Sequence, residues 1–523
     1  PSRTGSRRRL FCADPFPLPW RRTRAGLAFV RSVSAVSEKR SAGVSLVAGI
    51  ALSGNRSAGV WPAWRTGCRA GAAFFLRGAS AIAEKFDNFA SIVTETAGGL
   101  RETLAGAEPK GMENDDIEVI QINIHGEDKP GLTSSLTDIL ARYDAAILDI
   151  GQANIHQTLS MGILFKTDSI RSGDIMKDLL FKAYELGIQI RFQPITVEQY
   201  EQWVGMQGKN RYIITMLGRK LTAQQIAAVT RVVAEQGLNI DSILRLTGRV
   251  SLDENARAPK SCIELSVRGN PHDKEGMQSR FLQLSTELGM DISFQKDDMF
   301  RRSRRLICFD MDSTLIETEV IDELAERAGV GAEVRAITES AMRGEIDFAE
   351  SFRRRVAMLK GLDESVMADI AEHLPFTEGL DRLMHVLKRL GFKTAILSGG
   401  FTYFGNYLRR KYGFDYVYAN ELEIEDGKLT GRYLGDIVDG KRKAELLKLI
   451  SQVENVDIAQ TIAVGDGAND LPMLSVAGLG IAFHAKPKVK ATAGQSLSTV
   501  GLDGILYFLG YKDSYIDDKQ FKL

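Results

Sequence analysis

The chain has 523 residues, which is too long for one hydrophobic core and indicates two to four domains. Lys and Arg balance Asp and Glu at 67 each, but residues 1–80 are strongly basic and the remainder is acidic. An acidic body argues against nucleic-acid binding, and no apolar run approaches the roughly 18 residues that a membrane span needs.

The cysteines and histidines indicate the expected redox environment and whether a zinc site is expected. The cysteines are Cys12, Cys68, Cys262 and Cys308, and they show neither C-x-x-C spacing nor the density of a secreted scaffold. We therefore expect a reduced, cytoplasmic setting. The six histidines share no metal-ligand spacing, so a zinc site is not expected.

Residues 1–111 differ in composition from the rest of the chain. They contain none of the fourteen methionines and three of the four tryptophans, and up to residue 80 they use Arg almost without Lys. One interpretation is an Arg-rich, acid-poor targeting peptide. The other is upstream translation outside the working protein, with a natural start at Met112. Either way, we treat this segment as an extension and exclude it from fold reasoning.

Two similar units are predicted next, at residues 112–198 and 210–298, separated by a polar linker near residues 200–209. Each has the ferredoxin-like order βαββαβ. In the first unit we expect strands at 117–124, 146–152, 161–166 and 189–194, and helices at 132–143 and 173–186. In the second we expect strands at 212–217, 240–247, 261–268 and 291–295, and helices at 222–236 and 274–288.

The first unit resembles an ACT domain, a module that commonly binds amino acids and regulates metabolic enzymes. The resemblance rests on the D-x-P-G turn from Asp128 to Gly131, which opens the first helix. Free L-serine or a similar amino acid is expected there, because Gly131 permits close approach and a helix N-terminus receives a carboxylate. A helix entry with Pro near its first position, which needs no ligand, is the alternative. The second unit has Gly218-Arg219-Lys220 at this place, which favours a purely structural role.

Polar residues follow several apolar runs in the last part of the chain. The run 306–309 ends in Asp310-Met311-Asp312-Ser313-Thr314, as expected where a buried parallel strand meets a ligand site. The run 394–397 ends in Ser398-Gly399-Gly400, and the run 461–464 ends in Gly465-Asp466-Gly467-Ala468-Asn469-Asp470. A helix predicted at 439–450 carries Lys441, Arg442 and Lys443 in its first turns. Each signal is modest alone, but their order is specific.

This ordered set resembles the haloacid dehalogenase superfamily of phosphohydrolases, over about residues 304–510. Within it the sequence resembles the phosphoserine phosphatases, including a helical insertion at about 317–378 that would form a small cap. The predicted fold is therefore α/β: a Rossmann-like core with a helical cap, preceded by two ferredoxin-like, ACT-like α+β domains. Residues 511–523 would form a tail.

The chemistry expected is attack by a carboxylate on a phosphate monoester. We predict Asp310 as the nucleophile, because a carboxylate can form an acyl phosphate, and Asp312 as the proton donor and acceptor. Mg²⁺ suits hard oxygen ligands. The resemblance assigns it the Asp310 carboxylate, the Asp312 backbone carbonyl and the Asp466 carboxylate, with Asp470 supporting the metal or Lys443.

The remaining site residues would bind the phosphate and the rest of the substrate. Ser398, the amide of Gly399 and Lys443 would hold the phosphoryl oxygens, with Lys441 and Arg442 as rival cations. Glu319 would pair with the substrate amine and Arg355 with its carboxylate, whereas Arg353 and Arg354 would be surface charges. Asn469 would contact the substrate. Met342 and Phe348 are candidate lid contacts, with cap core as the alternative.

The predicted function is Mg²⁺-dependent hydrolysis of phosphoserine to serine and phosphate, the last step of serine biosynthesis. Two alternatives stay open: a phosphotransferase that passes the phosphoryl group to an alcohol such as homoserine, and an amino-acid sensor with a weak phosphatase domain. A homodimer is expected from the resemblance, because ACT-like units often pair edge-to-edge. Neither a nucleic-acid partner nor a membrane is expected.

Overall fold

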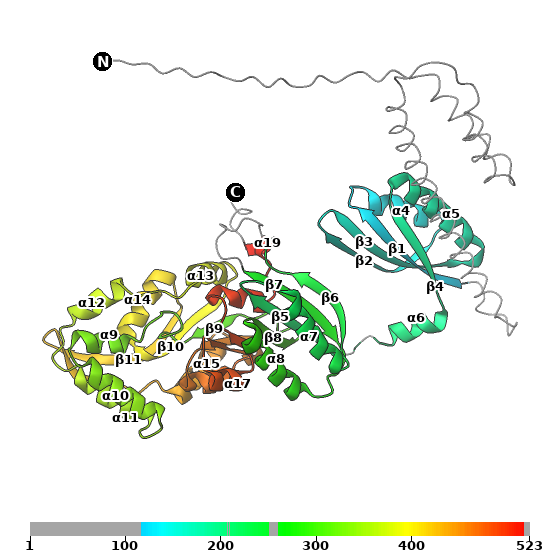
Figure 1. Cartoon of the computed structure of the whole chain (residues 1–523). Helices are drawn as coiled ribbons and strands as arrows, with labels where there is room; N and C mark the ends of the chain where they lie inside the picture. The colour runs from blue at the N-terminus through cyan, green and yellow to red at the C-terminus, as the bar shows by residue number, and fades with distance from the viewer. Residues whose placement is uncertain (1–116, 207, 209, 250–259, 517–523) are drawn as a thin grey trace, which may run out of the picture. The chain divides into compact units, whose positions relative to one another are not determined.

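The computed structural model describes residues 117–206, 208, 210–249 and 260–516 (Figure 1). These residues belong to two compact units that divide between Tyr200 and Glu201. Within the described residues, no helix is both long and apolar enough to cross a membrane. The predicted extension at 1–111 lies outside the described residues.

The first unit is a four-stranded antiparallel sheet with the order β2-β3-β1-β4 and with two helices. Its elements are β1 (Ile117–Glu127), α4 (Leu132–Arg142), β2 (Ala146–Ile155), β3 (Thr158–Asp168), α5 (Ser169–Leu186) and β4 (Gln189–Ile195). Apolar side chains of β1 and β3 pack with those of α4 and α5 in one core. The predicted βαββαβ order is confirmed. A further helix, α6 (Val197–Val204), occupies part of the expected linker.

The second ferredoxin-like fold repeats this topology with the strand order β6-β7-β5-β8. Its elements are β5 (Arg211–Gly218), α7 (Ala223–Glu235), β6 (Asn239–Arg245), β7 (Ser261–Arg268), α8 (Lys274–Leu288) and β8 (Asp291–Lys296). Unlike β1, strand β5 is buried on both faces after its first residue. One face packs on α7 and α8. Leu217 instead joins the core of the following domain, predicted to be catalytic and called the catalytic domain from here on, together with Leu246 and Cys262.

The catalytic domain is built on a seven-stranded sheet with the order β12-β11-β10-β9-β13-β14-β15. All neighbouring pairs are parallel except β11 and β12. The strands are β9 (Leu306–Phe309), β10 (Lys393–Phe401), β11 (Tyr416–Glu425), β12 (Lys428–Leu434), β13 (Thr461–Gly465), β14 (Leu479–Phe483) and β15 (Ser496–Leu497). The helices include α13 (Leu380–Arg389), α14 (Thr402–Tyr412), α15 (Gly440–Val453), α16 (Leu471–Val476) and α17 (Pro487–Ala493). The predicted α/β core is confirmed.

The cap is a group of four helices inserted between β9 and α13, at one end of this domain in Figure 1. They are α9 (Val320–Arg327), α10 (Gly331–Met342), α11 (Phe348–Met358) and α12 (Ser365–Glu372). Apolar side chains from these helices, such as Leu324 and Phe352, join the same core as β9. The small helical cap is therefore present, as predicted.

Polar contacts also attach the second ferredoxin-like fold to the catalytic domain. Asp291, fully buried at the start of β8, accepts hydrogen bonds from the backbone N–H groups of Ser498 (2.7 Å) and Thr499 (2.9 Å). The Gln495 side chain bonds to both backbone groups of Phe294, at 2.8 and 3.1 Å. A buried carboxylate and amide with satisfied partners define one relative position of the two folds.

Candidate active site

The site lies where the parallel strands β9, β10 and β13 end. Asp310 follows β9, and its N–H donates to the carbonyl of Val464 on β13 at 2.9 Å. Asp466 follows β13 directly. Because parallel strands end at the same edge of a sheet, residues more than 150 positions apart in sequence come together here.

Three carboxylates and one lysine form the centre of the site. Carboxylate oxygens of Asp310, Asp466 and Asp470 all lie within 4.8 Å of one another. The Lys443 ammonium lies 2.8 Å from Asp310 Oδ2 and 2.7 Å from Asp470 Oδ1, with no exposed surface. Burial alone would lower the pKa of Lys443, but Asp310 and Asp470 outweigh it and raise that pKa. The lysine therefore stays cationic and fixes both carboxylates.

The donor set fits a hard divalent cation. Burial, followed by the charge of Asp310, raises the pKa of Asp466 to about 7 and that of Asp470 to about 8. Carboxylates that repel one another in a buried position need a positive charge beside them, and oxygen ligands are those that Mg²⁺ prefers. The Thr314 hydroxyl donates to Asp466 Oδ1 at 3.2 Å, which orients that carboxylate.

Asp312 lies beside this cluster and is also buried. Its Oδ1 accepts a hydrogen bond from the N–H of Val320 at 3.2 Å, at the start of the cap. Burial raises the pKa of Asp312 well above its usual range, and the nearby Glu319 and Asp310 carboxylates raise it further. A carboxyl group whose pKa is raised in this way is better suited to proton donation than an ordinary one.

The irregular last part of β10, after Leu397, forms a narrow cradle of backbone and hydroxyl groups. The buried Ser398 hydroxyl accepts from the N–H of Gly400 at 2.9 Å. A Cβ at Gly400 would lie 2.4 Å from Asp312 Oδ2, so a larger residue there would have to displace that carboxylate. A Cβ at Gly399 would meet the Phe348 ring of the cap at 3.0 Å. Phe348 therefore covers the cradle.

Asn420 on β11 is a site residue that the sequence did not reveal. Its side-chain amide donates to the carbonyl of Gly399 at 2.8 Å, and its side-chain oxygen accepts from the N–H of Val438 at 2.8 Å. It is almost completely buried. Asn420 therefore fixes the cradle from behind. Its only sequence signal is a polar side chain within the run 416–422.

The cap residues predicted to bind substrate lie on two helices that approach the same edge. Glu319 is the N-cap residue of α9, and its Oε1 accepts from the Ser313 hydroxyl at 2.9 Å. Arg355 lies on α11, where its buried Nε has no hydrogen-bond partner among the described residues. Burial lowers the pKa of Arg355, and the carboxylates of Glu319 and Asp322 oppose this. Asn469 precedes Asp470. A Cβ at Gly467 would lie 2.1 Å from the side-chain oxygen Oδ1 of Asn469.

The basic residues next to Arg355 and Lys443 in the sequence pair with glutamates outside the acidic cluster. Arg353 and Arg354 are exposed and both pair with Glu350. Lys441 and Arg442 are paired with Glu445 on the outer face of α15. Met342 ends α10, but its side chain lies outside what the structure describes. The structure thus brings together Asp310, Asp312, Ser398, Gly399, Lys443, Asp466 and Asp470, with Phe348 above them.

Comparison with known proteins adds three family matches. ACT-domain models match residues 118–193 and 211–295, and a haloacid dehalogenase-like hydrolase model matches residues 307–475. A phosphoserine phosphatase of Streptomyces coelicolor is 38% identical over 76% of this chain and 93% of that protein. One from Mycobacterium tuberculosis is 39% identical over 75% of this chain and 93% of that protein. The chain belongs to the phosphoserine phosphatase family.

A solved structure is also similar. A probable phosphoserine phosphatase from Vibrio cholerae, in unliganded form, is 34% identical and matches with a TM-score of 0.46. The match covers 61% of this chain and 90% of that one. The predicted combination of two ACT domains with a haloacid dehalogenase-like hydrolase domain is confirmed by the family models.

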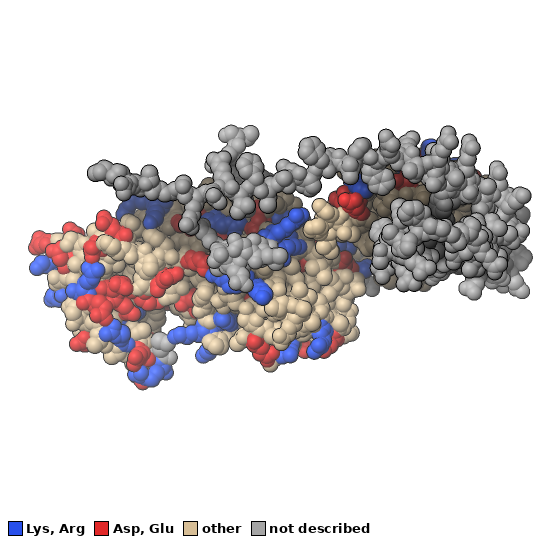
Figure 2. All heavy atoms as spheres, turned by 45° about the horizontal axis from the view of Figure 1, so that its top comes forward, with Lys and Arg blue, Asp and Glu red and all other residues tan. Residues whose placement is uncertain are grey.

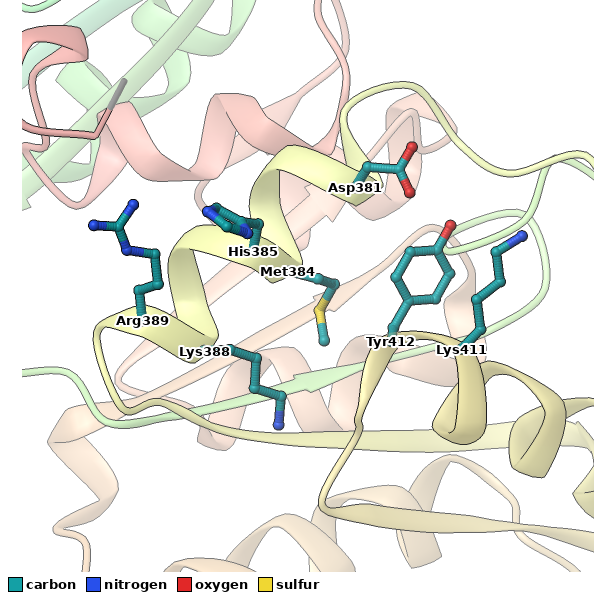
Figure 3. A pocket seen from close by; sticks show the side chains of 7 residues that line it. All are labelled: Asp381, Met384, His385, Lys388, Arg389, Lys411 and Tyr412. Carbon is teal, nitrogen blue, oxygen red and sulfur yellow. The ribbon is translucent and has the colours of Figure 1, made fainter. Parts of the chain in front are cut away.

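Two hollows lie on the catalytic domain. One, of about 370 Å³, is lined by Ser313, Asp466 and His484, and so opens beside the acidic cluster. The other, of about 510 Å³, is lined by α13 and α14 (Figure 3). There Lys388 bonds to Asp415, and Lys411 lies 3.9 Å above the Phe376 ring. The second hollow contains none of the predicted catalytic residues.

On the face shown in Figure 2, cationic and anionic side chains are interspersed.

The predicted amino-acid site of the first ACT domain is an exposed turn. Gly131 has a φ of 88°, which favours glycine, and α4 begins after it without a side-chain cap. The Asp128 carboxylate accepts a hydrogen bond from the Asn154 side chain. The first amides of α4 are therefore not occupied by a capping side chain.

Proposed function

We propose that this chain hydrolyses O-phospho-L-serine to L-serine and phosphate through a phospho-aspartyl intermediate on Asp310. The observation that carries the proposal is the position of the Asp310 carboxylate, 2.8 Å from the buried Lys443 ammonium and close to two further carboxylates. A charged lysine there stabilises the negative charge of a phosphoryl group as it arrives.

In the first step an Asp310 oxygen forms a bond to phosphorus while the bond between phosphorus and the serine oxygen breaks. Asp312 gives its proton to that leaving oxygen, which departs as the serine hydroxyl. In the second step Asp312 takes a proton from water, whose oxygen bonds to phosphorus and releases Asp310. The raised pKa of Asp312 supports both roles, because a higher proton affinity favours holding a proton for donation and taking one back from water.

Mg²⁺ is the proposed metal, held by Asp310, the Asp312 backbone carbonyl and Asp466. Bound there, it would neutralise phosphate charge and help align the displacement. Asp470 supports Lys443 through its 2.7 Å contact. Ser398 and the amide of Gly399 would bind phosphoryl oxygens, with Asn420 fixing their positions.

The decisive test replaces the nucleophile. Asp310→Asn should abolish turnover of phosphoserine and trapping of beryllofluoride, because the amide forms no acyl phosphate. The matched control is Asp369→Asn, a change at an exposed carboxylate that pairs with Arg327. Phosphate release with Mg²⁺ and with EDTA is the measurement, and homoserine is added in one arm. Substantial activity of Asp310→Asn, or phosphohomoserine as the main product, would contradict the proposal.

Substrate choice is proposed to reside in Glu319 and Arg355 of the cap, with Asn469 at the same edge. Arg355→Ala should reduce kcat/KM for phosphoserine roughly ten- to a hundredfold, because a charge-assisted carboxylate pair is lost. p-Nitrophenyl phosphate, which lacks a carboxylate, should be affected far less. Arg354→Ala is the control, since Arg354 is exposed and pairs with Glu350. Equal losses on both substrates would show that Arg355 does not bind the carboxylate.

We also propose that the first ACT domain binds free L-serine or a similar amino acid at Asp128 and Gly131. The uncapped start of α4 supports this, because its amides suit a carboxylate. Calorimetry on residues 112–200, which have their own core, should show serine binding that Gly131→Val removes. Absence of binding to the unsubstituted fragment would leave this domain a scaffold.

The assembly and compartment are proposals as well. A homodimer is supported by β2, an edge strand with exposed apolar side chains such as Ile147 and Ile150. Analytical ultracentrifugation of the full chain would decide this, since a monomer at micromolar concentration would contradict it. A cytoplasmic location is supported by the cysteine spacing, and cell fractionation would test it.

A further inference from the structure

The cap is joined to the core by two antiparallel segments that pair with each other. The N–H of Glu317 donates to the carbonyl of Pro375 at 2.9 Å, and the N–H of Thr377 donates to the carbonyl of Leu315 at 3.1 Å. Ile316 and Phe376 form an antiparallel bridge between them. We name residues 315–317 and 375–378 the cap hinge. Any opening or closing of the cap acts on this hinge, because both connections of the cap pass through it.

The second ACT domain holds the last residue of the cap hinge. Arg219 donates from Nη1 to Glu378 Oε1 at 2.9 Å and from Nη2 to the other carboxylate oxygen. Its Nε donates to the carbonyl of Thr499 at 3.1 Å. Lys260 adds a second cation 3.8 Å from Glu378. A two-pronged guanidinium–carboxylate pair fixes orientation as well as distance.

The catalytic domain fixes Glu378 from the other side. The N–H of Leu502 donates to the Glu378 carbonyl at 2.8 Å. A Cβ at Gly501 would lie only 2.1 Å from that carbonyl oxygen, so glycine is needed for this contact. Asp503, next in the same turn, pairs with Lys260 and Arg382. Glu378 is thus held between a loop of the catalytic domain and the second ACT domain.

This contact lies on the wall of the active-site hollow. Thr377, Glu378 and Gly501 line the same 370 Å³ hollow as Ser313 and Asp466. Ser313 in turn donates to Glu319, the N-cap residue of α9 in the cap. A displacement of Glu378 would therefore change both the hinge and the wall beside the acidic cluster.

We propose that Arg219 is a positioning residue for the cap, and that the second ACT domain acts as a fixed support for the cap hinge. Arg219 occupies the turn where the first ACT domain has D-x-P-G. The following helix α7 is capped by its own side chains, Thr222 and Gln225, so this turn is used for a contact within the chain. The inference rests on the proposed function only for its choice of substrate.

The test uses the full chain and hydrogen exchange of the hinge. In Arg219→Ala, the amides of Glu317 and Thr377 should exchange about three- to fivefold faster, as expected for losing one partly exposed ion pair. Arg268→Ala is the matched control, because Arg268 pairs with Asp241 inside the second ACT domain. The double variant Arg219→Glu with Glu378→Arg should restore exchange to within about twofold of the original rate.

Kinetics provide the second measurement. Arg219→Ala should lower kcat/KM for phosphoserine, which contacts the cap, about three- to tenfold more than for p-nitrophenyl phosphate. Unchanged hinge exchange in Arg219→Ala, or a double variant that stays as mobile as the single one, would overturn the inference. Hydrogen exchange of the hinge is measured without turnover. Its result is therefore independent of whether phosphoserine is the substrate.

Discussion

The two ACT domains share one topology but differ at the turn that follows their first strand. In the first, Gly131 opens α4 in the left-handed region and no side chain caps the helix. In the second, Thr222 and Gln225 form a capping box at the start of α7, and Arg219 reaches Glu378 of the catalytic domain. A few residues at one turn thus decide whether the start of the helix is exposed, as in the first ACT domain, or whether the turn binds the catalytic domain, as in the second.

The hydrophobic cores of the two ACT domains also differ in whether they share residues with the catalytic domain. Among the described residues, the core of the first domain is formed by side chains that lie between Ile120 and Phe192 in the sequence. The second has its own core, yet Leu217, Leu246 and Cys262 pack with residues of the catalytic sheet and cap. One fold can therefore serve as a module with its own core or as a part of a larger core, depending on whether the open face of its sheet is covered.

The largest difference should appear on deletion. Removing residues 1–200 should leave the melting temperature of the catalytic unit nearly unchanged, whereas removing residues 1–300 should lower it by roughly 10 °C or more. Each re-exposed large apolar side chain costs about 1.5–3 kcal/mol, and 1 kcal/mol corresponds to about 2–4 °C at this size. Calorimetry of both truncated chains tests this. Equal melting temperatures would show that the second domain is as separable as the first.

The next effect concerns one buried ion pair. Glu264 of the second ACT domain lies 2.5 Å from Arg301, and both side chains are buried. Glu264→Gln should cost about 3–5 kcal/mol, because it leaves the arginine charge uncompensated. The first domain supplies the control: Asp174→Asn removes an exposed pair with Lys177 and should cost about 0.5 kcal/mol or less. Urea unfolding measures both, and similar losses would refute the distinction.

The smallest expected effect concerns the helix starts. Thr222→Ala removes the side chain that accepts from the N–H of Gln225, and should cost about 1 kcal/mol. In the first domain, Ser134→Ala should be nearly neutral, since that hydroxyl donates to a carbonyl and caps no amide. If Ser134→Ala proves the more damaging in thermal unfolding, the first helix start is not as open as described.

The strand ends of the catalytic domain were predictable because parallel strands bring distant residues to one edge. Asp310, Ser398 and Asp466 each follow an apolar run, so sequence order alone indicated their meeting. The choice of Lys443 over its neighbours came from a family resemblance, and the structure gives the physical reason: Lys443 is buried, whereas Lys441 is paired on the surface.

Other features could not be predicted, because they depend on tertiary contacts without a local pattern. Asn420 bonds to a carbonyl about 20 residues away, and a single polar residue in a strand does not reveal its partner. The attachment of Arg219 to Glu378 joins residues 159 positions apart. The sequence indicated only that the second turn lacked D-x-P-G. The packing of the second ACT domain on the catalytic domain shows that Arg219, in place of that motif, binds Glu378.

The double pairing of Lys443 has a consequence for covalent labelling. An amine must lose its proton before it attacks an acylating reagent, and Asp310 and Asp470 raise the pKa of Lys443 while the protein excludes solvent from it. Lys441, two residues earlier, is 85% exposed. Acetylation of the folded protein should therefore modify Lys441 readily and spare Lys443, so protection of Lys443 beside a labelled Lys441 would report that the active site is folded.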